Sequence, residues 1–87
     1  MASFIVTYDL PAGSEYDELI SAIKSYGTWA HLTLSTWCVV TDETARDVRD
    51  YLASFVPNGG RIFVVKTAPG AAWRNVICHG EWLKRNL

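Results

Sequence analysis

Three of the predicted strands carry unbroken runs of apolar residues. These runs are Phe4-Ile5-Val6, Val39-Val40 and Ile62 to Val65. A strand with one face in water alternates apolar and polar residues, whereas an unbroken run indicates burial on both faces. A sheet built from these strands therefore needs a cover on each side.

Four segments have the composition of strands. They are rich in β-branched and aromatic residues, and turn signals separate most of them. The predicted strands span residues 3–8, 28–33, 36–40 and 61–67. Only Leu34-Ser35 separates residues 28–33 from residues 36–40, so a single long bent strand is the alternative there.

Two segments between the strands have helical spacing of their apolar residues. The first runs from Ser14 to Tyr26, with Ser14 as its expected cap and Gly27 as its end. The second begins at Thr41-Asp42-Glu43 and ends before Pro57. The resulting order is β-α-β-β-α-β, which predicts an α+β, ferredoxin-like two-layer sandwich.

We divide the chain into a core, residues 1–67, and a C-terminal extension, residues 68–87. The extension is expected to form a loop and then a short helix from about Glu81 to Asn86. Two helices cover only one face of a four-stranded sheet. The second face is therefore covered by the extension, by a second subunit or by both, and we expect a homodimer or a higher homo-oligomer.

Charge and cysteine content narrow the possible partners. Eight Lys and Arg face nine Asp and Glu, so the net charge of −1 gives no general basic field for a long polyanion. A short nucleotide needs only a few local donors and stays possible. Cys38 and Cys78 are expected to be free thiols, and no signal peptide or membrane span is predicted. We expect a cytoplasmic protein.

Several segments together are similar to one known family. The first strand FIVTYDL, the helix ending in SYG, the strand pair WAHLTLSTWCVV and the closing RIFVVK resemble the CRISPR-associated Cas-two-like superfamily, as a divergent or non-CRISPR relative. The resemblance covers residues 3–67. It implies a ferredoxin-like protomer, a two-fold homodimer with packed sheets, and a metal-binding, phosphodiester-cleaving role for Asp9. The acidic stretch LPAGSEYDE after Asp9 departs from DNA-binding members, which carry arginines and lysines there.

Two residues are candidates for catalysis. Asp9 follows the first strand, and paired with its copy across a two-fold axis it would hold Mg²⁺ through oxygen ligands. His31 lies among strand residues and would act as a general acid or base. The alternatives are a turn-forming Asp ahead of Pro11 and a partly buried structural His.

Nine residues are candidates for binding a ligand. Indole faces stack on nucleobases, cations contact phosphates, and hydroxyls in a turn donate hydrogen bonds. Packing in the core or an interface is the alternative for each indole, and ordinary turn chemistry for the hydroxyls. The candidates are Tyr8, Trp29, Ser35, Thr36, Trp37, Arg61, Lys66, Trp73 and Arg74.

Four functions follow from these residues. The first is a homodimeric protein that binds nucleic acid or a nucleotide in a groove of aromatics and a few cations. The second is a Mg²⁺-dependent endoribonuclease that uses paired Asp9 carboxylates. The third is a phage or mobile-element protein that sequesters a nucleotide immune signal. The fourth is a pure assembly module.

Overall fold

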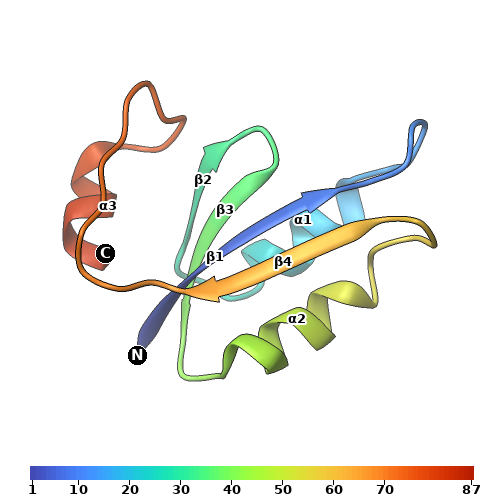
Figure 1. Ribbon diagram of the computed structural model, residues 1–87, viewed down its shortest axis with the longest axis horizontal. Coiled ribbons are helices and arrows are strands. Elements are labelled where there is room, and N and C mark those ends of the chain that lie inside the picture. The colour runs from blue at the N-terminus through green and yellow to red at the C-terminus, as the bar shows by residue number, and fades with distance from the viewer.

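A four-stranded antiparallel sheet forms the centre of the protein (Figure 1). The computed structural model describes residues 1–87, and the predicted α+β class is confirmed. None of its three helices has the length and apolar character needed to cross a membrane. The elements are β1 (Ala2–Asp9), α1 (Asp17–Lys24), β2 (Trp29–Thr33), β3 (Thr36–Thr41), α2 (Ala45–Ala53), β4 (Arg61–Lys66) and α3 (Gly80–Asn86).

The strands lie in the order β2-β3-β1-β4, so β1 is hydrogen-bonded on both sides. Its partners β3 and β4 are both antiparallel to it. Ile5 lies opposite Cys38 on one side and Val65 on the other, and Cys38 in turn lies opposite Ala30. The separation of β2 from β3 is confirmed, with Leu34 at the exposed tip of the turn.

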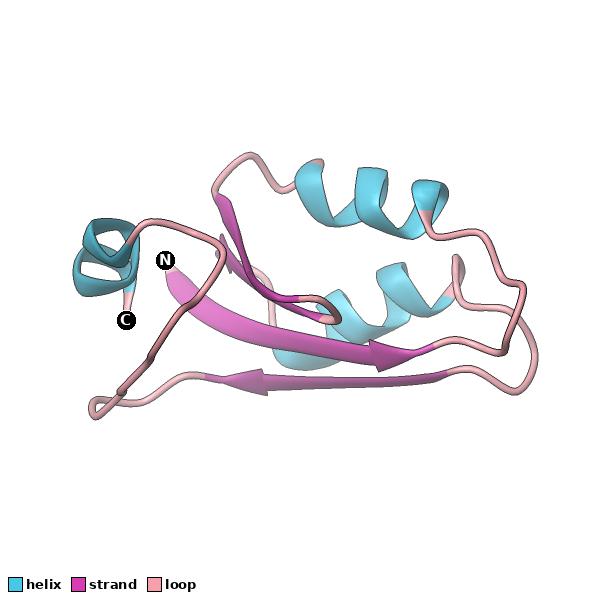
Figure 2. Ribbon diagram, turned by 90° about the horizontal axis from the view of Figure 1, so that it is seen from above, coloured by secondary structure: helices cyan, strands magenta, loops and turns pink.

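One face of the sheet packs against α1 and α2, which lie side by side on it (Figure 2). Alternate residues of β1 point to this face, because successive strand side chains alternate between faces. They meet the apolar sides of both helices in a single cluster. Its fully or almost fully buried members are Phe4, Val6, Tyr8, Leu19, Ala22, Ile23, Trp37, Val39, Val48 and Leu52.

The opposite face is covered over only part of its width. Cys38 and Ala30 point to this face and are buried, and Leu83 of α3 is buried with 1% of its surface exposed. No helix lies over β4 on this side, where Phe63 is 61% and Val65 42% exposed. Residues 68–87, the C-terminal segment, thus cover the β2–β3 side and leave the β4 side open.

Helix α1 is shorter than predicted, because it begins at Asp17 and not at Ser14. Gly13 has a φ of 82°, and the Ser14 N–H donates to the Pro11 carbonyl, so the chain is still turning at Ser14. The expected cap by Ser14 is therefore wrong. Tyr16 occupies the cap position and makes no side-chain cap bond.

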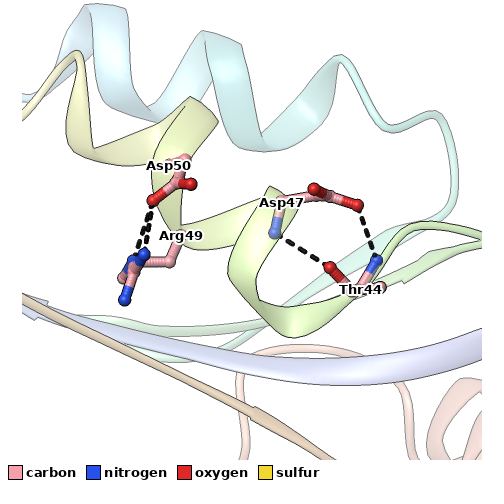
Figure 3. Close-up of polar contacts among 4 residues, drawn as sticks. All are labelled: Thr44, Asp47, Arg49 and Asp50. Carbon is pink, nitrogen blue, oxygen red and sulfur yellow. Dashed lines mark hydrogen bonds and ion pairs between the residues drawn. The ribbon is translucent and has the colours of Figure 1, made fainter.

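Helix α2 is capped by Thr44, three residues after the predicted start (Figure 3). The Asp47 N–H donates to Thr44 Oγ1 over 3.1 Å, and the Thr44 N–H donates to the Asp47 carboxylate over 3.2 Å. This reciprocal capping box satisfies two N–H groups that would otherwise lack partners. On the solvent-exposed side of α2, the Arg49 guanidinium forms an ion pair with the carboxylate of the adjacent Asp50, with 2.7 Å between nitrogen and oxygen.

Replacing the cap of α2 is expected to destabilise the protein. Thr44→Ala should lower the free energy of unfolding by about 1 kcal/mol, because the Asp47 N–H loses its acceptor. Urea unfolding followed by circular dichroism measures this loss. Thr41→Ala is the matched control, since Thr41 accepts only the Glu43 N–H. A loss in Thr41→Ala as large as in Thr44→Ala would contradict the observed cap.

Candidate functional site

Asp9 lies at the exposed end of β1 beside one cation. Its carboxylate is 3.9 Å from the Arg61 guanidinium, and both side chains are largely exposed. No group of three or more His, Cys, Asp or Glu side chains is close enough together to hold a metal ion. A lone carboxylate already beside a guanidinium does not fit a Mg²⁺ site. One subunit thus supplies only Asp9 here, and the metal centre that pairs Asp9 with its copy in a second subunit stays a prediction.

His31 is held in an aromatic stack on the helix-covered face. Its ring lies 4.0 Å from that of Trp37 at an interplanar angle of 10°, and its Nε2 donates to the Leu34 carbonyl over 3.2 Å. Trp37 Nε1 donates to the Tyr8 hydroxyl over 3.2 Å. Burial raises the pKa of Tyr8. Asp9 belongs to the opposite face by strand alternation, so the two candidate catalytic residues are not brought together.

Trp29 lies beside this stack and takes a cation on its ring. Lys24 Nζ is 5.0 Å from the Trp29 ring centroid and 6.0 Å from that of Trp37. Trp37 is buried and Trp29 is half-buried, so both indoles pack in the protein. Of the predicted binding residues, Tyr8, Trp29 and Trp37 thus belong to the apolar core and its edge.

Three other predicted residues lie elsewhere on the molecule, and of these Arg61 lines a small pocket of about 330 Å³ together with Tyr8 and Asp9. The Ser35 carbonyl accepts the Tyr8 N–H in the β2–β3 turn, which gives Ser35 a structural role. Lys66 lies in the same row as Phe4, next to the start of β1. Arg61 lies at the other end of β4, opposite Asp9.

The remaining three candidates, Thr36, Trp73 and Arg74, line one cleft. The cleft has a volume of about 560 Å³ and lies between the open face of the sheet and the C-terminal segment. The sheet contributes Ile5 and Thr36 to its wall. The structure thus brings three of the nine predicted binding residues to one cavity.

The rest of the wall is mainly apolar and carries hydroxyl groups. Leu32 and Thr33 come from β2, Thr67 from the end of β4, and Val76 and Leu83 from the C-terminal segment. Thr33 is one of the turn hydroxyls that the sequence predicts as phosphate donors, whereas sequence reasoning missed the other four residues. Side chains alternate along β2, which puts Leu32 on the second face, but only the path of the chain after Thr67 shows what lies over it.

Backbone hydrogen bonds tie the chain to the sheet just before the C-terminal segment and near its middle. The Thr67 N–H donates to the Ser3 carbonyl over 3.0 Å, and the Ile77 N–H donates to the Leu32 carbonyl over 2.9 Å. Figure 1 shows this segment leaving β4 and passing along the side of the sheet to α3. The segment forms one wall of the cleft between these two hydrogen bonds and again beyond Ile77, where Leu83 and Leu87 line it.

Trp73 packs against the start of α3. A methyl group added at Gly80 would lie 3.3 Å from the Trp73 indole nitrogen, so the indole rests on the Gly80 backbone. The indole is still 37% exposed. It thus has a fixed place at the cleft and an accessible surface.

Charge is divided unevenly along the chain. Residues 1–60 carry three cations and eight carboxylates, whereas residues 61–87 carry five cations and one carboxylate. The cations of the second group belong to β4 and the C-terminal segment. No Asp or Glu side chain lines the cleft, and Arg74 is its single charged side chain. The cleft is therefore suited to a ligand that carries negative charge.

Beneath the C-terminal segment, Cys38 is fully buried. Burial, with a smaller contribution from the neighbouring Cys78, raises the pKa of its thiol to about 11. Neither cysteine is in a disulfide. The accessibility of the Cys38 thiol to solvent therefore reports whether the C-terminal segment stays packed over it.

No model of a known protein family matches this chain, and no curated protein or solved structure is significantly similar to it.

The buried thiol predicts how stability depends on pH. Between pH 9 and 11 the folded protein keeps the Cys38 proton while the unfolded chain, with an ordinary pKa of 9.0, loses it. The free energy of unfolding should therefore fall as the pH rises through this range, by up to about 1.4 kcal/mol per pH unit from this group. Urea unfolding at pH 8, 9, 10 and 11 measures the slope.

Tyr8 and Tyr26 also have pKa values raised by burial and add to the same slope. Cys38→Ala removes only the contribution of the thiol, and Cys78→Ala is its matched control. Cys38→Ala should flatten the slope and Cys78→Ala should keep most of it. Equal slopes in wild type and Cys38→Ala would show that Cys38 is solvated.

Proposed function

We propose that this protein binds a nucleotide in the cleft between its sheet and its C-terminal segment. The observation that carries the proposal is the set of side chains that line this cleft. It combines apolar side chains, the accessible indole of Trp73, the hydroxyls of Thr33 and Thr36, and the guanidinium of Arg74. Small-molecule sites are concave, mostly apolar and contain a few polar groups that orient the ligand.

Each part of a nucleotide has a partner of matching chemistry at this cleft. A base stacks on an indole with a free energy of about 1–3 kcal/mol. Guanidinium binds phosphate with two parallel hydrogen bonds. The C-terminal segment carries three cationic side chains, Arg74, Lys84 and Arg85, and one carboxylate side chain, Glu81, and this positive balance attracts an anion.

For the fold, we propose a ferredoxin-like arrangement related to the Cas-two-like superfamily. The elements from β1 to β4 follow the order β-α-β-β-α-β, and the strands lie in the order β2-β3-β1-β4. This order, with both helices on one face, supports the split βαβ arrangement. The relationship to the superfamily rests on the segments quoted from the sequence.

We also propose that the protein works as a homodimer through the uncovered part of the sheet. Phe63 and Val65 on β4 are large apolar side chains with more than two-fifths of their surface in water. Ile5 lies beside Val65 in the next strand. A second copy seated here would remove this apolar surface from water and would border the open side of the cleft.

The binding proposal is tested with the full chain by isothermal titration calorimetry against the four nucleoside 5′-monophosphates. We expect at least one to bind, and Arg74→Ala to weaken it by about tenfold or more, because a charged hydrogen-bond partner is lost. Arg61→Ala is the matched control, since Arg61 is also an exposed arginine and lies at the other end of β4. Binding that depends on Arg61 and not on Arg74 would contradict the proposed site.

The dimer is tested by light scattering after gel filtration. We expect the wild type to be a dimer at micromolar concentration and Phe63→Glu to be a monomer, because a buried charge in an apolar interface is costly. Leu34→Glu is the control, since Leu34 is 85% exposed at an isolated turn. A wild-type monomer, or a Phe63→Glu dimer, would remove the proposed interface.

A further inference from the structure

We infer that the ligand of the cleft is a single nucleotide with one phosphate group, held with its phosphate at Arg74 and its base against the apolar wall. This inference rests on the proposed function and goes beyond it in ligand class. The expected ligands are nucleoside monophosphates, including cyclic ones, and the cleft should not favour di- and triphosphates or polymers over them.

The first argument concerns charge. Arg74 is the only cation among the residues that line the cleft, and its guanidinium has donors for one phosphate in bidentate geometry. A second or third phosphate would find no further cationic partner there. No Asp or Glu side chain lines the cleft, so the wall also lacks the carboxylates with which proteins usually hold the Mg²⁺ of a triphosphate.

The second argument concerns orientation. Arg74 is exposed, whereas Leu83 is 1% exposed and Ile5 and Leu32 are half-buried. The charged group of the ligand therefore belongs at the rim, where water still contacts it, and its flat neutral part belongs at the inner wall. This placement avoids the cost of moving a phosphate out of water without enough partners.

The third argument concerns the hydroxyls at the wall. Thr36 Oγ1 donates to Thr7 Oγ1 over 3.2 Å, so the proton of Thr36 is already in use. Its two oxygen lone pairs stay free to accept a hydrogen bond, and the exocyclic amino group of adenine, cytosine or guanine is a donor of that kind. Uracil has no exocyclic amino group and offers only its ring N3–H, which lies between two carbonyls and reaches less far than an amino group. Thr36 thus predicts a preference among bases that depends on one hydroxyl.

The experiment compares affinities by calorimetry, on the full chain, for adenosine, AMP, 3′,5′-cyclic AMP, ADP, ATP and the six-nucleotide strand of deoxyadenylate. Guanine and cytosine ligands form parallel series. In the series that binds best, we expect the monophosphate to bind about tenfold tighter than the nucleoside. The di- and triphosphates should gain less than threefold over it, with or without Mg²⁺.

Arg74→Ala should reduce the affinity for the monophosphate to that for the nucleoside and leave the affinity for the nucleoside unchanged. Arg74→Lys should keep part of the gain, because lysine retains the charge and loses the bidentate geometry. Thr36→Val should remove the preference over UMP. The melting temperature of each variant without ligand verifies that it is folded.

The outcomes separate this inference from the proposed function. A triphosphate or the six-nucleotide strand that binds more than tenfold tighter than the monophosphate would overturn the inference and leave nucleotide binding intact. Equal binding of nucleoside and monophosphate would overturn the role of Arg74 as the phosphate partner. If none of these nucleotides binds, the proposed function itself fails.

Discussion

β1 is hydrogen-bonded to β3 on one side and to β4 on the other, and its side chains need a cover on both faces. This constraint governs the rest of the structure. On one face, α1 and α2 supply the cover through the cluster around Val6 and Leu52. On the other, the C-terminal segment does so only over β2 and β3. The cleft exists because this second cover is incomplete and is made by a loop and a short helix, which do not fill the space beneath them.

The two covers differ in charge as well as in shape. The helices belong to the part of the chain with eight carboxylates and three cations, and the C-terminal segment to the part with five cations and one carboxylate. The net charge of −1 conceals this division. A low net charge argues against a field that surrounds the molecule, but it leaves room for one face that attracts anions. The distribution of the charges, and not their sum, therefore bears on the choice of ligand.

Much of the fold was predictable because periodicity and turn residues are local signals. The strand pair around Leu34 and the start of the last helix near Glu81 follow from such signals, and the structure has both. The cap position of α1 lies two residues after the predicted Ser14, and the cap of α2 lies three residues after the predicted start at Thr41, since several residues near each start are able to cap and only the local turn decides between them. The site was less predictable. Arg74 and Thr36 are far apart in sequence, and their meeting depends on the path of the chain after Thr67. His31 and Trp37 lie opposite each other in the sheet. Whether their rings pack inside the protein or bind a ligand depends on how far each side chain is buried.

The walls of the cleft come from opposite ends of the chain, with Ile5 in its first strand and Leu83 in its last helix. A pocket of this kind is complete only when the whole chain has folded. Partly folded forms that lack the docked α3 have no second wall and therefore no binding site. Any ligand of the cleft would thus bind only the fully folded protein. Its binding free energy would stabilise the packing of the last helix against the sheet.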